Sequence, residues 1–193
     1  MKKILVALCA LWLSAGACAA DRQHHSLWSL KGKTNTVYLL GSVHFLNASE
    51  QLPAVVDEAY QDAEMLLMEI DMDDLDPAET QQITLELGML PAGQSLEQQL
   101  GKQTYSRLST RAQELGIDPL LLNRCRPWFA AMTLVQLQLV KLGLDPASGI
   151  EQRFTTRAVA DNKPIHGLET LREQLGMLAA ALPYAVCFFL LWN

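Results

Sequence analysis

The chain has 193 residues, a formal net charge of −6 at neutral pH and a hydrophobic share of one half. An acidic chain is a poor partner for nucleic acid, whose binding depends on lysine and arginine, and for an anionic lipid surface. The length suits one domain with a real hydrophobic core.

The first twenty residues predict a cleavable signal peptide. Two lysines begin it, the short apolar run Ile4–Leu13 follows, and Ala17-Cys18-Ala19 has the small residues of a cleavage site. The run is shorter than the ~20 residues that a membrane span needs. We therefore expect export to the periplasm or the medium. Cleavage before Cys18 would instead give a lipoprotein at a membrane, but Ala15-Gly16-Ala17 lacks the large apolar residue usual before such a cysteine.

Strand and helix patterns alternate in the next part of the chain. Ser26–Leu30 and Thr36–Leu40 flank a polar turn, which predicts a β-hairpin. Because Thr36–Leu40 is almost continuously apolar, we expect it to be buried on both faces. Pro53–Ala63 has the apolar spacing of an amphipathic helix, and Met65–Ile70 predicts a second buried strand. A strand, a helix and a strand in this order predict a parallel pair.

The middle of the chain predicts helices. Asp76 and Ser95 stand where helix N-caps are expected. Gly116 and Gly143 lie where longer periodic segments end, as left-handed caps do. The remaining segments are the helices Lys102–Leu115, Pro127–Leu142, Ile150–Ala160 and Leu171–Leu182 and the short strand Pro164–Leu168. The fold class is α/β, with an N-terminal β-hairpin, short parallel strands, a helix-rich middle and an incomplete sheet.

Residues 183–193 do not fit this pattern, because they are nearly all apolar and have no period. Two explanations compete: a hydrophobic docking segment, or the truncated, perhaps frameshifted, end of a longer chain. We favour truncation, so that residues 21–182 form a partial α/β domain. The tail also contains Cys187, which export would allow to pair with Cys125, although two buried thiols are the simpler expectation.

Three chemistry-bearing residues occupy equivalent places in this topology. His44 follows the first strand just after Gly41, a residue that permits close backbone approach, Glu69 closes the second strand, and Glu169 follows the third. If the strands are parallel neighbours, the three side chains meet at the carboxyl edge of the sheet. One imidazole with two carboxylates suits a divalent metal ion, or a carboxylate that acts as a general base.

Structural explanations compete with this site. Either glutamate could cap a helix or pair with an arginine, although a charge inside the apolar run around Glu69 is costly unless it is paired. No phosphate-binding loop, CxxC pair, HExxH or GxSxG motif occurs. The possible arginine partners of these glutamates are Arg124, Arg126 and Arg157. Arg126 could also bind an anionic group. We expect mainly structural roles for the helix-opening Glu151, the core histidine His166 in the third strand, the core Trp128 and the acidic turn Asp71–Asp76.

Six segments in order resemble the TraB/GumN family, which is related to the Tiki metalloproteases. Each segment is weak evidence alone, but their order is fairly specific, and the likeness runs from about residue 27 to 180. The segments are Tyr38–His44 with its Gly-x-x-His, Leu52-Pro53, Met68–Asp71, Arg126-Pro127-Trp128, Gly149-Ile150-Glu151, and Lys163-Pro164 with Gly167–Thr170 and Gln174.

The resemblance implies an α/β domain with a metal site built from His44 and acidic residues. In Tiki enzymes such a site hydrolyses peptide bonds near the N-terminus of a substrate, and its transfer to this chain is an analogy. The resemblance also implies a second GxxH histidine, which is not found after Glu169. We predict an exported, metal-dependent, peptidase-like hydrolase, with a divalent ion held by His44, Glu69 and Glu169 and with the two glutamates catalytic, or an inactive product of truncation. The alternative is a non-catalytic module that binds or inhibits a peptide or protein.

Overall fold

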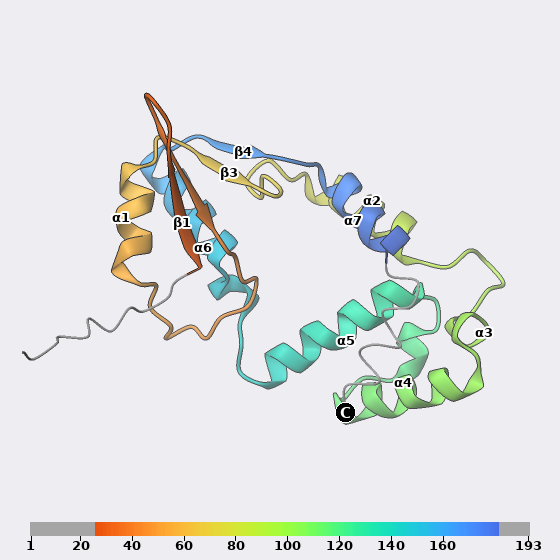
Figure 1. Ribbon diagram of the computed structural model, residues 1–193. Coiled ribbons are helices and arrows are strands. Elements are labelled where there is room, and N and C mark those ends of the chain that lie inside the picture. The colour runs from red at the N-terminus through yellow and green to blue at the C-terminus, as the bar shows by residue number, and fades with distance from the viewer. Residues whose placement is uncertain (1–25, 182–193) are drawn as a thin grey trace, which may run out of the picture.

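The computed structural model describes residues 26–181, so the predicted signal peptide and the apolar tail lie outside the described residues (Figure 1). The described part is mixed α/β, as predicted, with two separate two-stranded sheets. Its strands are β1 (Leu27–Lys31), β2 (Thr36–Leu40), β3 (Leu66–Met68) and β4 (Ile165–Gly167). Its helices are α1 (Ala54–Asp62), α2 (Pro77–Gly88), α3 (Leu96–Leu100), α4 (Lys102–Glu114), α5 (Pro127–Lys141), α6 (Ile150–Asp161) and α7 (Leu171–Ala181), with short 3₁₀ turns at Pro119–Leu122 and Pro146–Ser148.

The predicted hairpin forms, but its second strand is not buried on both faces. In the antiparallel register Trp28 lies opposite Leu39 and Leu30 opposite Val37. These four side chains share one face and are between 44% and 59% exposed. The other face packs on a hydrophobic cluster. The expectation of full burial was therefore wrong, because in the described part of the chain β2 pairs only with β1 and only one of its faces meets other elements.

The parallel pair is formed by β3 and β4, with Leu66 opposite Ile165, and not by Thr36–Leu40 with Met65–Ile70 as predicted. Lys163, in the turn before β4, donates hydrogen bonds to the backbone carbonyls of Tyr60 and Ala63, which lie just before β3. These bonds join the turns that precede the two strands, while β1 lies next to β2. The strand predicted as Met65–Ile70 is also shorter and half-exposed, because three paired residues form a narrow sheet.

The capping residues in the sequence predicted where the helices begin and end. The Asp76 side chain accepts from the backbone N–H of Glu79, and Ser95 forms the predicted capping box with Gln98. Gly116 and Gly143 adopt φ of 83° and 84°, the left-handed conformation that ends a helix without the steric cost of a Cβ. The two longest helices begin where predicted, and each ends within one residue of the expected position.

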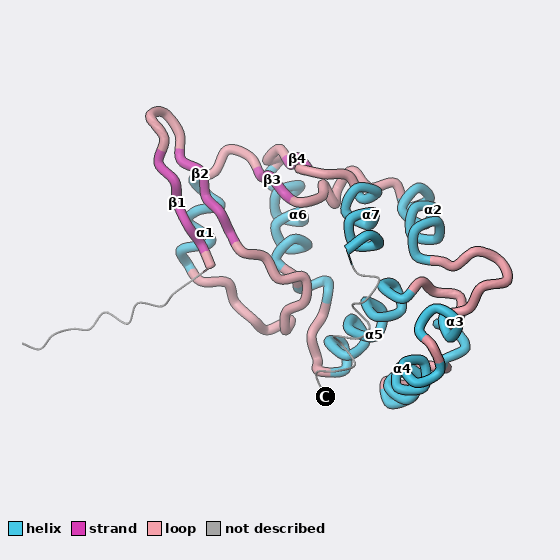
Figure 2. Tube along the Cα trace, turned by 45° about the vertical axis from the view of Figure 1, so that its right-hand side comes forward, coloured by secondary structure: helices cyan, strands magenta, loops and turns pink. Residues whose placement is uncertain are grey.

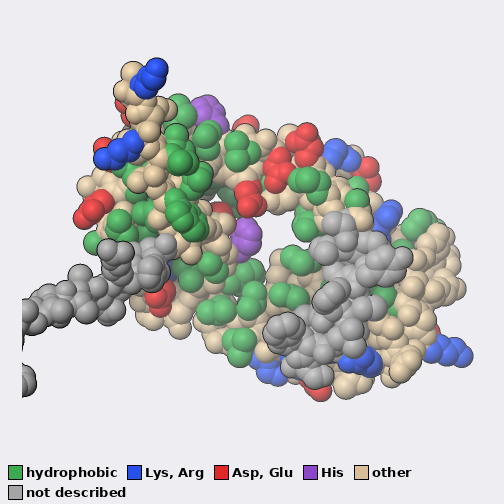
Figure 3. All heavy atoms as spheres, in the orientation of Figure 1, with side chains coloured by type: hydrophobic (Ala, Val, Ile, Leu, Met, Phe, Trp, Pro, Cys, Tyr) green, Lys and Arg blue, Asp and Glu red, His purple; other side chains and the backbone are tan. Residues whose placement is uncertain are grey.

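Two hydrophobic clusters stabilise different parts of the molecule. The larger packs α3, α4 and α5 around Leu108 and Leu134, and the smaller packs the hairpin, α1 and α6 around Val56, Tyr60 and Phe154. Figure 2 shows these two groups of elements joined across one side by β3, β4, α2 and α7. Figure 3 shows open space between the two groups. None of the helices in residues 26–181 combines the length and hydrophobicity needed to cross a membrane.

Candidate functional site

The loop after β2 is fastened to the start of α6. The Gly41 N–H donates to the Ser26 carbonyl at 2.7 Å, and the Ile150 N–H donates to the Val43 carbonyl at 2.9 Å. Leu46 and Asp145 then exchange two backbone hydrogen bonds in an isolated antiparallel bridge. These bonds place the Gly-x-x-His segment against the helix N-terminus.

Gly149 allows this close approach. A Cβ at this position would lie 2.2 Å from the carbonyl oxygen of His44, which is far inside van der Waals contact. Its φ is −58°, a value open to any residue, so space and not backbone conformation requires the glycine. The segments around His44 and Gly149 are therefore built as one unit.

His44 and Glu151 face each other across this junction. The His44 Nδ1 atom lies 3.2 Å from Glu151 Oε1, with the histidine side chain 68% exposed and the glutamate side chain 20% exposed. Both carboxylate oxygens are buried, and neither accepts a well-formed hydrogen bond from the described residues. A buried carboxylate without hydrogen bonds is costly. The α6 dipole offsets part of that cost, and a positive charge on the imidazole or a bound cation would offset more.

Glu69 and Glu169 form a second pair at the ends of β3 and β4. The Glu169 N–H donates to the Glu69 carbonyl at 3.0 Å, so the parallel pairing continues to these residues. The Gln174 Nε2 atom lies 2.9 Å from Glu69 Oε2 and 3.2 Å from Glu169 Oε1. One amide group therefore joins the two carboxylates.

Met68, the residue before Glu69, contacts the face of α6 that carries Glu151. The Thr155 hydroxyl donates to the Met68 sulfur at 3.5 Å, and Met68 directly precedes Glu69. Glu151 lies four residues before Thr155, so it occupies the same face one helical turn earlier. His44 thus reaches Glu151, whereas the two predicted glutamates reach Gln174, because β2 does not join the sheet of β3 and β4.

The arginines considered as structural partners bind elsewhere. Arg124 and Arg126 donate to the backbone carbonyls of Leu90 and Met89, and Arg157 pairs with Asp57. In the described part of the chain, neither Glu69 nor Glu169 forms an ion pair with lysine or arginine. Trp128 is a core residue as expected: it is buried, and its indole N–H donates to the Leu87 carbonyl.

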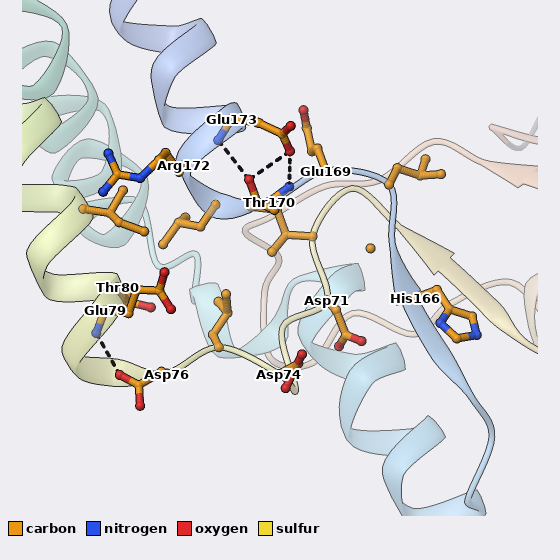
Figure 4. Close-up of a pocket in the computed structure, with 16 residues that line it drawn as sticks. Asp71, Asp74, Asp76, Glu79, Thr80, His166, Glu169, Thr170, Arg172 and Glu173 are labelled. Carbon is orange, nitrogen blue, oxygen red and sulfur yellow. Dashed lines mark hydrogen bonds between the residues drawn. The ribbon is translucent and has the colours of Figure 1, made fainter.

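An acidic cavity of about 640 Å³ is lined in part by Glu169, one member of the second pair (Figure 4). Its wall includes Asp71, Asp74, His166 and Glu169. His166 is exposed in β4, so the expectation of a core histidine was wrong. The narrow sheet leaves the side chain of this central strand residue at the surface.

The available donors supply part of a metal site. An imidazole nitrogen and carboxylate oxygens suit a divalent cation, and the buried, unsatisfied oxygens of Glu151 fit a positively charged partner. No group of three or more His, Cys, Asp or Glu side chains among residues 26–181 is arranged to hold a metal ion. The donors lie as two pairs instead.

The structure places two residues, Glu151 and Gln174, in contact with the predicted site residues. The sequence assigned Glu151 to helix opening, although the neighbouring Gly149 was a sign of close packing. It placed Gln174 only within a resembling segment, and no local signal linked it to Glu69, which lies 105 residues away.

Comparison with known proteins supports the resemblance seen in the sequence. An uncharacterised protein, YbaP, from Shigella flexneri is 30% identical over 166 residues, as is YbaP from Escherichia coli (strain K12). The match covers 83% of this chain and 60% of each relative, so the chain spans about three fifths of the length of these relatives. No solved structure matches. The model of the TraB/PrgY/gumN family matches residues 26–190, and the chain therefore belongs to that family.

Proposed function

We propose that this chain is an exported hydrolase of the peptidase type, in which His44 and Glu151 form the reactive pair. The observation that carries the proposal is an exposed imidazole aimed at a buried carboxylate that accepts no hydrogen bond from the described residues. A purely structural ion pair would satisfy the carboxylate oxygens more fully. The peptide substrate is inferred from the likeness to Tiki metalloproteases.

The chemistry of the pair follows from its orientation. With Nδ1 directed at Glu151, the Nε2 atom of the exposed ring is left toward solvent. Nε2 can then take a proton from the water that attacks a peptide carbonyl, while the Glu151 carboxylate stabilises the imidazolium that forms. The His44 imidazolium can then give this proton to the leaving amine, so that the proton taken from water leaves with the product.

A divalent ion belongs to the same proposal. In this metal-dependent form of the proposal, His44, Glu69 and Glu169 would hold the ion, with Glu151 as a further donor. The ion, in place of His44 as the base, would polarise the carbonyl and activate water. The described donors lie in two pairs, so no step of the residue chemistry above is assigned to the ion.

The first test measures metal binding by isothermal titration of the exported chain with Zn²⁺ and Mn²⁺. We expect about one ion per chain, and we expect His44→Ala to abolish its binding because the only nitrogen donor is removed. His166→Ala removes the other imidazole of the described residues, which lies in the wall of the acidic cavity beside Glu169. It should leave binding unchanged because His166 is not one of the proposed ligands. Wild-type stoichiometry in the His44→Ala variant would contradict the metal assignment.

Peptide-library cleavage tests the hydrolase assignment. Metal-dependent cleavage that is lost in both His44→Ala and Glu151→Gln would support it. Peptide binding without cleavage would favour the second candidate, a non-catalytic module that captures a peptide or protein. The exposed apolar face of the hairpin, which hydrolysis does not require, favours that candidate.

Export itself is tested at the N-terminus of the secreted protein. Mass spectrometry should find a chain beginning near Ala20 or Asp21. A lipid-modified Cys18 would instead establish the membrane-anchored alternative.

A further inference from the structure

We propose that Arg153 is a positioning residue for His44, an inference that rests on the proposed function of the His44–Glu151 pair. Arg153 lies on α6, two residues after Glu151, and its side chain reaches the loop that follows His44. The Nη1 atom donates to the Glu50 carbonyl at 2.6 Å, and the Nη2 atom donates to the Asn47 carbonyl at 3.2 Å. The helix that carries the buried carboxylate therefore also holds the loop that carries the imidazole.

The two carbonyls that Arg153 binds belong to one hydrogen-bonded turn. The Glu50 N–H donates to the Asn47 carbonyl at 2.9 Å, which closes the turn. The Asn47 side chain accepts from both the backbone N–H and the hydroxyl of Ser49. These bonds fix the two carbonyls relative to each other, so the planar guanidinium of an arginine can bind both at once. A lysine ammonium is a point charge on a flexible stem and fits this pair of acceptors less well.

Glu151 and Arg153 hold the loop from opposite sides of α6. Successive residues of an α-helix are rotated by about 100°, so two side chains that are two positions apart point away from each other. The loop therefore crosses the N-terminus of α6 between its contact with Glu151 and its contact with Arg153. Gly149 lies at this crossing, because a Cβ there would meet the His44 carbonyl oxygen.

The position of His44 depends on these contacts of the loop. Its side chain is 68% exposed, so packing does not hold the imidazole opposite Glu151. After His44 the loop is joined to the rest of the molecule by the Leu46–Asp145 bridge and then by the two bonds from Arg153. Without Arg153 the loop keeps only its backbone contacts, and we expect the imidazole to spend less time against the carboxylate.

Imidazole NMR of the metal-free protein tests this role without requiring catalysis. Arg153→Met keeps an unbranched aliphatic side chain but removes both donors. We expect the His44 ring signals of this variant to move toward those of Glu151→Gln, in which the carboxylate charge is absent, and Arg153→Lys to give a smaller shift. Arg172→Met is the matched control, since it removes a guanidinium that forms two 3.0 Å bonds with Glu86, and it should leave the His44 signals unchanged.

Two arginine variants keep the test decisive. His44 signals at their wild-type positions in both Arg153→Met and Arg153→Lys would overturn the proposal, because the loop would then hold the imidazole without the guanidinium. Should Arg153→Met fail to fold, Arg153→Lys decides in the same way, since it keeps the positive charge and the aliphatic stem.

Kinetics separate this inference from the proposed function. For a peptide that the wild type cleaves, Arg153→Met should lower kcat by about tenfold or more and change KM by less than about twofold, because Arg153 orients the base and does not bind the substrate. An unchanged kcat, or a loss that lies in KM alone, would contradict the positioning role. A wild-type chain that cleaves no peptide would contradict the proposed function, and the His44 signals would then decide the role of Arg153 by themselves.

Discussion

At the scale of single residues, the chemistry of this chain depends on what surrounds a side chain more than on its type. Glu151 looked like an ordinary acid in the first turn of a helix, yet its oxygens are buried beside His44. Glu69 looked isolated in an apolar strand, yet it shares an amide donor with Glu169. In each case the partner comes from a distant part of the sequence.

Tyr60 gives a prediction at the same scale. It is buried in the smaller cluster, and its hydroxyl donates to Asp161 Oδ2 at 2.8 Å. Burial, followed by that hydrogen bond, raises the pKa of Tyr60 to about 12 from an ordinary value of 10. Because the pKa is higher in the folded state, its contribution to stability is complete below pH 10 and is lost as the pH rises toward 12.

We therefore expect Tyr60→Phe to cost about 1 kcal/mol at pH 7, the usual net value of one hydrogen bond. Above pH 10 the variant should lose less stability than the wild type, because it has no Tyr60 hydroxyl to ionise. Urea unfolding measured between pH 7 and pH 12 checks both effects. If the wild type and the variant lose stability in parallel above pH 10, the assignment to Tyr60 is wrong.

At the scale of elements, the important junction lies between the loop after β2 and the N-terminus of α6. It is held by backbone hydrogen bonds and by Ile150, which packs against the smaller cluster, and it requires the absence of a side chain at Gly149. Backbone contact of this kind tolerates no added atom, because a packed interior cannot absorb an overlap of this size without a shift.

Gly149→Ala should consequently destabilise the protein by about 1–3 kcal/mol, the usual cost of overpacking. It should also move His44 away from Glu151, which would be seen as a change in the imidazole NMR signals. Gly176→Ala in α7 is the matched control, since a Cβ there meets no atom within 4 Å. The control should be neutral or stabilising by about 0.5–1 kcal/mol. Equal behaviour of the two variants would refute the tight junction.

At the scale of the whole molecule, the two hydrophobic clusters share no residue. The candidate site adjoins the smaller cluster, whereas most of the fully buried large side chains belong to the larger one. Regions with separate cores can open separately. A defect in the helical cluster should therefore weaken that part of the molecule first.

Leu108→Ala tests this separation. Leu108 is fully buried between α4 and its neighbours, so its truncation should cost about 2–5 kcal/mol. Hydrogen exchange should accelerate in α3, α4 and α5 while α1 and α6 keep their wild-type protection. Leu120→Ala, at a side chain that is 70% exposed, is the control and should change little. Equal acceleration in α6 would show that the two clusters unfold as one unit.

Much of the fold could be predicted because it depends on near neighbours in the chain. The caps at Asp76 and Ser95 and the left-handed glycines at 116 and 143 act within a few residues, so the helices were placed almost correctly. The hairpin register follows from one short turn. The order of segments that marks the TraB/PrgY/gumN family was likewise visible in the sequence alone.

The tertiary structure decided which strands pair and which side chains meet. The apolar pattern of a strand does not show which strand it pairs with. Here β4 lies beside β3, with Lys163 joining the turns before them, while β2 pairs with β1. Because of this strand pairing, His44 lies next to Glu151, whereas Glu69 and Glu169 lie next to Gln174. The sequence by itself determined the family, the helices and the residue types of the candidate site. Their partners depend on contacts between residues about one hundred positions apart, which local periodicity does not encode.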